Sequence, residues 1–241
     1  MTIKSIWLRR IHKWVGLLVG LQFLLWAISG TAMALLDTDE VAGGPKAQTA
    51  APALRWASTA WPQVQRALRG EQLGKLTIRP LPQGTAYQVT TAKGVHLFST
   101  IDGSSITIDA ALAAAVARAA HPDHAAVKGV RPLKQLTLAV REHRLPIWQV
   151  DFGDARSSTY YVSGSTGELL ERRNDSWRLW DFFWMLHIMD YGDRASFNHP
   201  LIIAMAAGLV WLAGTGVWLL FRTMWRHDFA WLRRGRPLQG R

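Results

Sequence analysis

Cysteine is absent from the 241 residues of this chain. Without thiols the protein cannot form disulfides, zinc–thiolate sites or Cys-ligated iron–sulfur clusters. The lack of cysteine does not reveal the compartment, because such a chain is compatible with either side of a membrane. The fingerprints of P-loops, Rossmann dinucleotide sites, HExxH metalloproteases and GxSxG hydrolases are also missing. Any electrons that this protein handles must therefore come from a partner or a quinol.

Charge is missing from two long stretches, Val15 to Leu36 and Leu201 to Phe221. As a helix the first stretch is about 33 Å long, enough to cross the hydrocarbon core of a bilayer. We therefore predict transmembrane helices over residues 14–36 and 199–222.

The first stretch also resembles a cleavable signal peptide, because Ala32-Met33-Ala34 matches an A-x-A cleavage site. However, the uncharged run is longer than a usual signal-peptide core. Trp14 stands at its edge and Trp26 lies within it. These features favour a retained anchor, and cleavage is the alternative.

Acidic residues are scarce at both ends of the chain. Residues 1–13 hold four bases and no acid, and residues 222–241 hold six arginines against Asp228, so the ends carry +4 and +5 of the net charge of +11. By the positive-inside rule both termini are cytoplasmic, as a basic segment over 1–13 and a basic tail over 223–241. The protein should then reside in a bacterial inner membrane, and charge in these places does not indicate nucleic-acid binding.

The middle of the chain has the pattern of a globular domain, and we predict a periplasmic α+β domain over 37–176. Short alternating strands separated by turn residues, with a helix over Ala110–Ala120 that Asp109 caps, indicate antiparallel meanders. The pattern repeats, over about 57–108 and 109–173. Ser163 to Leu170 echoes Ser99 to Ile106, and the second hairpin gains about three residues around Gly153 to Ser157.

Residues 177–192 are rich in tryptophan and phenylalanine but also carry charge. The stretch is too short and too charged to cross a membrane. Tryptophan and tyrosine favour the headgroup level, so we predict an amphipathic helix at the outer interface.

Several motifs resemble the PepSY-associated transmembrane family. Tyr161 to Leu170 is similar to the strand–turn–strand signature of PepSY domains, and Arg10 to Leu17 is similar to the first helix of the family's membrane proteins. Trp184 to His187 and Gly214 to Leu219 resemble a later helical region. The resemblance covers nearly the whole chain. It implies two transmembrane helices flanking an extracytoplasmic PepSY-like α+β domain of two helix-plus-meander repeats.

This family includes siderophore-linked ferric reductases, whose transmembrane histidines hold haem. The resemblance therefore implies haem b, one or two per chain, with pairs of histidines as axial ligands to the iron. The predicted topology places His12 and His227 at the cytoplasmic face and His187 and His199 at the outer face. Nearby arginines, among them Arg9, could pair with haem propionates. The family's reductases have about four spans, so a two-span chain implies a homodimer or a partner membrane subunit.

Simpler interpretations of these histidines exist. His12 and His227 stand among arginines, where a solvated cation is common, and His199 could merely cap the second span. Of the remaining histidines, we interpret His121 to His124 as a solvated turn.

The leading hypothesis is an inner-membrane haem protein that moves electrons outward to an acceptor such as a ferric siderophore. Enzymatic activity as a ferric siderophore reductase, or as a subunit of one, stays open. The alternatives are a non-enzymatic membrane-anchored PepSY protein that binds or assembles a larger complex, and an accessory subunit without a cofactor. The electron donor is not indicated by the sequence.

Overall fold

The structure is a computed structural model that describes residues 3–45, 47, 59–192, 194, 196 and 198–227. The chain divides into two compact units. One unit comprises Met1–Ala34 together with Phe182–Arg241, and the other comprises Leu35–Asp181.

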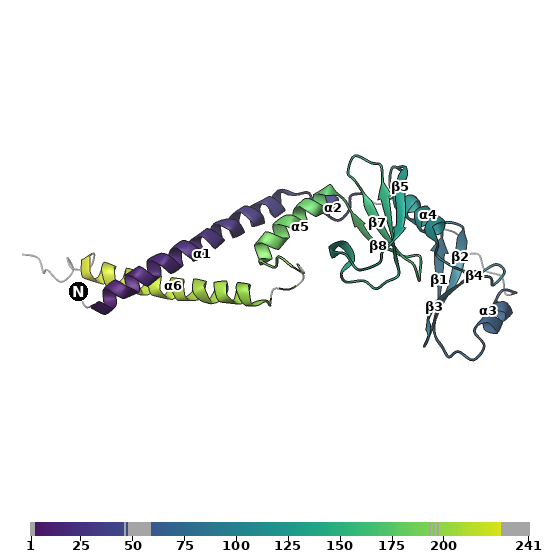
Figure 1. Cartoon of the computed structure of the whole chain (residues 1–241), viewed down its shortest axis with the longest axis horizontal. Helices are drawn as coiled ribbons and strands as arrows, with labels where there is room; N and C mark the ends of the chain where they lie inside the picture. Colours follow the sequence, from purple (N-terminus) through teal and green to yellow (C-terminus); the bar gives the residue numbers. More distant parts are fainter. Residues whose placement is uncertain are drawn as a thin grey trace, which may run out of the picture. The chain divides into compact units, whose positions relative to one another are not determined.

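The first unit contains the two long helices α1 (Ile3–Leu35) and α6 (Pro200–His227), both seen in Figure 1. Their apolar parts, Trp7–Leu35 and Pro200–Phe221, contain 29 and 22 residues and are long enough to cross a membrane. The protein is therefore a membrane protein with two transmembrane helices, and the predicted fold class is confirmed. α1 begins well before residue 14, because the basic segment continues the same helix.

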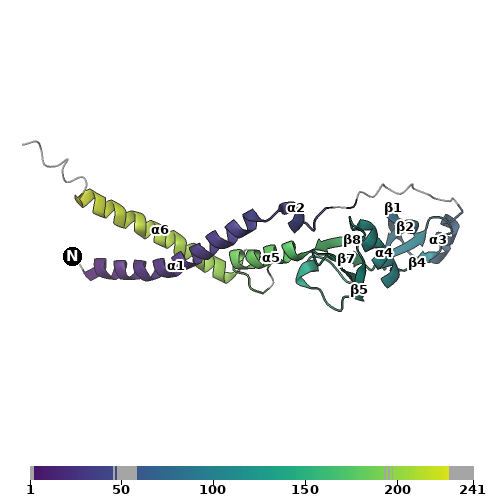
Figure 2. The same ribbon diagram turned by 90° about the horizontal axis from the view of Figure 1, so that it is seen from above.

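Glycine allows α1 and α6 to pack closely as an antiparallel pair, and the two helices cross each other in Figure 2. A Cβ placed on Gly16 would lie 3.4 Å from Leu212, and one on Gly208 would lie 3.4 Å from Val19. Small residues at such positions let helix backbones approach each other in lipid. Gly20, one turn from Gly16, has nothing within 4 Å of its Cβ position and faces away from this contact.

The second unit contains two four-stranded antiparallel sheets, with strand orders β1-β2-β3-β4 and β5-β6-β7-β8. A short helix, α2 (Thr38–Val41), leads into this unit. The first sheet follows α3 (Trp61–Ala67) and consists of β1 (Leu73–Leu81), β2 (Gly84–Thr91), β3 (Gly94–Ser99) and β4 (Ser105–Ile106). The second sheet follows α4 (Ala110–Ala120) and consists of β5 (Val127–Pro132), β6 (Ile147–Phe152), β7 (Thr159–Ser163) and β8 (Leu169–Arg173). A 3-10 turn, η1 (Leu138–Val140), precedes β6.

The glycine turns of the two sheets have the same hydrogen bonds. The Gly103 amide donates to Ser99 O at 3.0 Å, and the Gly167 amide donates to Ser163 O at 2.9 Å. Both glycines have positive φ, +73° and +67°, which side chains disfavour. The hairpin between β6 and β7 is longer than that between β2 and β3. Its extra residues lie between Phe152 and Thr159, the region predicted from the spacing.

Each helix covers a sheet with a small apolar face. In the first half, Val64 of α3 and Leu68, directly after it, pack against Tyr87 and Val89 of β2. The larger core unites both halves, because Leu97 and Ile108 of the first half join α4 and the buried residues of β6 and β7. The Asp109 carboxylate accepts the Leu112 amide at 2.8 Å, which confirms the predicted cap of α4.

The helix α5 (Asp175–Ile188) occupies most of the stretch for which an amphipathic helix was predicted. It begins where β8 ends, and the Asn174 side chain accepts the Trp177 amide at 2.8 Å in its first turn. Its last residues, from Phe182 onward, belong to the unit of the two long helices. The interfacial location of this helix stays a prediction.

The interpretation of His121 as part of a solvated turn was wrong. Its side chain is 1% exposed and packs against the rings of Phe152 and Tyr160. Its Nε2 lies 3.4 Å from Asp154 Oδ2. Burial raises the pKa of Asp154, but hydrogen bonds from Ser158 and His121 outweigh it, and the pKa lies below its ordinary value. His121 directly follows α4, and its side chain is buried because it packs against these two rings of the core.

We expect Asp154→Asn to destabilise the domain at neutral pH. Because the folded-state pKa is lowered, the stabilisation is fully present above the ordinary pKa of about 4 and is lost as the pH falls through the folded value. In thermal unfolding of the full chain in detergent, the variant should have a free energy of unfolding about 1–3 kcal/mol lower than the unsubstituted protein at pH 7. This difference should become smaller below pH 4. The exposed neighbour Asp123→Asn is the control, and an equal loss at both pH values would contradict the expectation.

Candidate functional site

The imidazole of His12 lies against α6. Its Nδ1 is 2.7 Å from Oγ1 of Thr215. The adjacent Gly216 provides space for the ring, since a Cβ there would lie 3.6 Å from the His12 Cε1. The ring also lies beside Trp211, with centroids 6.2 Å apart. The His12 ring is therefore hydrogen-bonded to a hydroxyl residue, and the glycine that follows this residue leaves space for the ring.

The hydrogen bonds of Thr215 indicate which nitrogen of His12 carries the proton. The Thr215 hydroxyl donates within α6, at 2.9 Å to Trp211 O and 3.1 Å to Leu212 O. A hydroxyl has one proton, so its oxygen is left to accept from Nδ1–H of His12. In the neutral form of this imidazole the lone pair is then on Nε2, which has no hydrogen-bond partner among the described residues. This is the form of imidazole that binds a metal.

His187 at the end of α5 is held in the same way by α1. Its Nδ1 lies 3.1 Å from Oγ of Ser29, and the Ser29 hydroxyl donates to Leu25 O at 2.7 Å. The next residue is again glycine. A Cβ on Gly30 would lie 3.3 Å from Cε1 of His187. By the same argument, Nδ1–H of His187 donates to Ser29, and in the neutral form of the ring the lone pair is on Nε2.

A further bond fixes the end of α5 on α1. The Trp26 indole N–H donates to the backbone oxygen of His187 at 2.7 Å. Trp26 lies one turn before Ser29 and Gly30, so three residues of one α1 face hold both the backbone and the ring of His187. The position of this imidazole is therefore fixed through both its backbone and its ring.

His199 lies close to His187. Its Nε2 donates to the backbone oxygen of Ile188 at 2.8 Å, the residue that follows His187. The structure thus brings His187 and His199 to the same end of the first unit, as the topology predicted. His199 differs from the other two histidines in that Nε2 is the bonded nitrogen.

His227 is the last residue of α6, and its side chain lies outside the described part of the structure. It follows Gly216 by eleven residues, which places its backbone about 17 Å further along the helix axis. The structure therefore does not bring the backbone of His227 alongside His12, and the predicted ligand role of His227 stays a prediction.

The two equivalent sites lie near opposite ends of α1. His12 and Ser29 are seventeen residues apart on this helix, or about 26 Å along its axis. Between them Gln22 has an amide nitrogen that is buried without a hydrogen-bond partner. The arrangement places an imidazole that is bonded to a helix hydroxyl near each end of α1.

Sequence reasoning identified the histidines but missed the residues that hold them. Thr215-Gly216 was noted only as part of the stretch Gly214 to Leu219 that resembles the family, and Ser29-Gly30 was not singled out as a candidate site. The available signal was a hydroxyl residue followed by glycine, present once in each apolar run and matched to a histidine elsewhere. The partners are 158 and 203 residues apart, so no local pattern pairs them.

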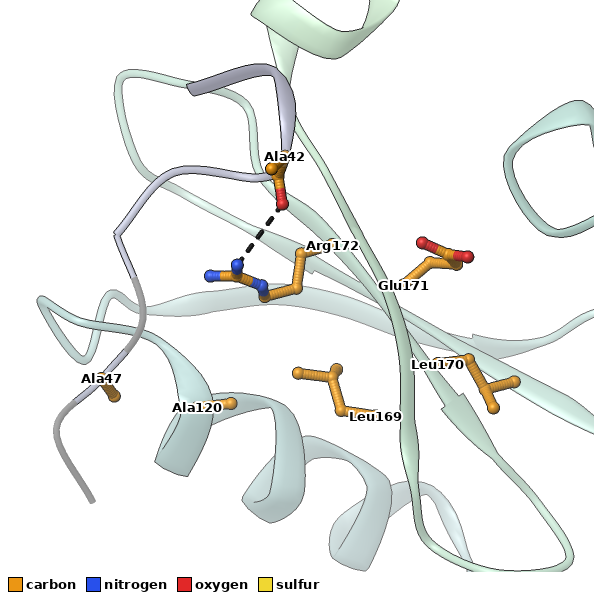
Figure 3. A pocket seen from close by; sticks show the side chains of 7 residues that line it. All are labelled: Ala42, Ala47, Ala120, Leu169, Leu170, Glu171 and Arg172. Carbon is orange, nitrogen blue, oxygen red and sulfur yellow. Dashed lines mark hydrogen bonds between the residues drawn. The ribbon is translucent and has the colours of Figure 1, made fainter. Parts of the chain in front are cut away.

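The second unit has a cavity of about 430 Å³ beside β8, shown in Figure 3. The Arg172 guanidinium donates hydrogen bonds to the backbone oxygens of Ala42, Gly44 and Pro45, at 3.0 to 3.3 Å. The rest of the lining is largely apolar, with Leu169 and Ala120 among it. Within the described residues, no group of three or more acidic or histidine side chains could hold a metal ion.

The sequence was compared with models of protein families. The model of the PepSY-associated TM region matches residues 9–241. The chain belongs to this family. The match includes both spans, the domain with two sheets, and the histidines described above, so the predicted resemblance is confirmed. No curated protein and no solved structure matches the PepSY-associated chain.

The two glycines that receive the histidines give a matched pair of substitutions. Alanine normally favours a helix over glycine by about 1 kcal/mol. Gly216→Ala makes an ordinary contact with His12, so it should be neutral or stabilising. Gly30→Ala brings a Cβ tightly against His187 and should cost about 1–3 kcal/mol. Thermal unfolding in one detergent measures both, and equal effects would contradict the close fit at Gly30.

Proposed function

We propose that this protein holds haem b through His12 at one membrane face and through His187, with His199, at the other, and that it passes electrons across the membrane. The observation that supports this most is the repeated arrangement. Two imidazoles near opposite ends of α1 each have Nδ1 held by a helix hydroxyl, and neither Nε2 has a hydrogen-bond partner among the described residues. An axial haem ligand requires an imidazole that is fixed in this way and binds through its neutral form.

The chemistry of the donors favours electron transfer. Haem with two histidine ligands has no open coordination position, so it supplies a one-electron carrier and not an oxygen-binding site. The residues of this chain orient the ligands, and the apolar span faces keep water away. Arg9 and Arg10, within one turn of His12, are placed to pair with propionates.

The distribution of charge supports one orientation of the chain in the membrane. Both ends of the chain are basic, which favours cytoplasmic termini in a bacterial inner membrane and places the PepSY-like domain in the periplasm. The donor is then a quinol or a cytoplasmic partner, and the acceptor lies outside. A ferric siderophore is the acceptor suggested by the family resemblance, because reduction weakens the binding of iron by hard oxygen ligands.

We expect the purified full chain to show a Soret band with the spectrum of low-spin haem. His12→Ala and His187→Ala should each remove a large part of this signal, because each removes an axial ligand. His96→Ala, a histidine of β3, should leave it unchanged. A chain without haem, isolated from cells supplied with haem precursors, would sink the redox proposal and favour a non-enzymatic anchor or assembly subunit.

The role assigned to Thr215 can be tested separately. Thr215→Val keeps the shape but removes the acceptor for Nδ1–H, so the haem held by His12 should change its reduction potential and lose affinity on the order of tenfold. Thr215→Ser keeps the hydroxyl and should restore both properties. Redox titration and haem quantitation give the result, and identical behaviour of the valine and serine variants would remove the hydroxyl from the argument.

A further inference from the structure

The two ends of the membrane unit are not equally supplied with imidazoles. Near Ser29 the described residues include both His187 and His199, and the His199 ring donates to the residue next to His187. Near Thr215 they include His12 alone. α6 reaches His227 only about 17 Å further along its axis. Within the described residues, a haem with two histidine ligands therefore has one ligand, His12, at this end.

We propose that a second copy of this chain completes the site, so that one haem is held between His12 of one copy and the partner subunit's His12. This inference rests on the proposed haem function. Copies inserted with the same orientation can be related by a two-fold axis along the membrane normal. Such an axis places equal residues at equal depth, so His12 of each copy lies at the level where the second ligand is needed.

The surfaces of the spans leave room for this partner. Of the apolar windows in the two spans, 11% and 0% of the residues are buried. Gly214, directly before Thr215, has nothing within 4 Å of its Cβ position, and the same holds for Gly20 on α1. Glycines on open helix faces allow another helix or a flat macrocycle to come close. The Nε2 of His12 has no hydrogen-bond partner among the described residues, so it is left to bind the iron of a haem shared with the partner.

A shared site and two independent sites respond differently in mixed dimers. Two tagged versions of the full chain, one wild-type and one His12→Ala, are co-expressed and isolated through both tags in sequence. The measured quantity is the low-spin haem signal per dimer, by absorbance and electron paramagnetic resonance. If His12 is shared, the mixed dimer loses as much signal as the dimer in which both copies carry His12→Ala. If each chain holds its own haem, the mixed dimer loses half as much.

The His187 end supplies the comparison. Its second imidazole, His199, belongs to the same chain, so a mixed dimer with His187→Ala should lose half of what the doubly substituted dimer loses. His124→Ala, an exposed histidine of the other unit, serves as the control for tagging and assembly.

The mass of the wild-type protein, by light scattering in detergent, is expected to be that of two chains. Haem-loaded protein with the mass of one chain, a half loss in the His12→Ala mixed dimer, or a different membrane protein in place of the second copy would overturn the shared site while leaving the haem function intact. Protein without haem would overturn both.

Discussion

A polar side chain inside a membrane must find its hydrogen-bond partner within the protein, because hydrocarbon offers none. This constraint organises the membrane unit. The imidazoles of His12 and His187 each contact a hydroxyl of a neighbouring helix, and each ring rests where a glycine leaves space. The contacts join α1 to α6 at one end and α1 to α5 at the other. α1 is thus the shared element, because it carries His12 and supplies Ser29, which contacts His187.

The domain with two sheets follows a different principle. Each half consists of a helix and an antiparallel meander, and the halves have the same serine–glycine turn. The first half has a small core of its own around α3 and β2. The main core takes residues from both halves, so the two repeats depend on each other for burial. At the cavity beside β8, the Arg172 guanidinium donates its hydrogen bonds to backbone oxygens. The histidines described above belong to the other unit.

The sequence predicted the parts that local signals determine. Two uncharged runs gave the spans, Asp109 gave the start of α4, and the glycine turns gave the repeat. It did not predict the contacts made over long separations. His121 seemed exposed because its neighbours are polar and proline, but the end of α4 turns it against Phe152 and Tyr160. Likewise, nothing near Thr215 in sequence indicates that it receives His12, because helix packing alone brings them together.

The hydroxyls that hold the histidines are also bonded to their own helices. Ser29 donates to Leu25 O and Thr215 donates to Trp211 O, each one turn back along the same span. Each hydroxyl is therefore satisfied before any tertiary contact exists, and the exposed oxygen lone pair is what remains for a histidine. A span of this kind can enter the lipid on its own and meet its neighbours afterwards, so biogenesis of the protein separates into insertion first and assembly second.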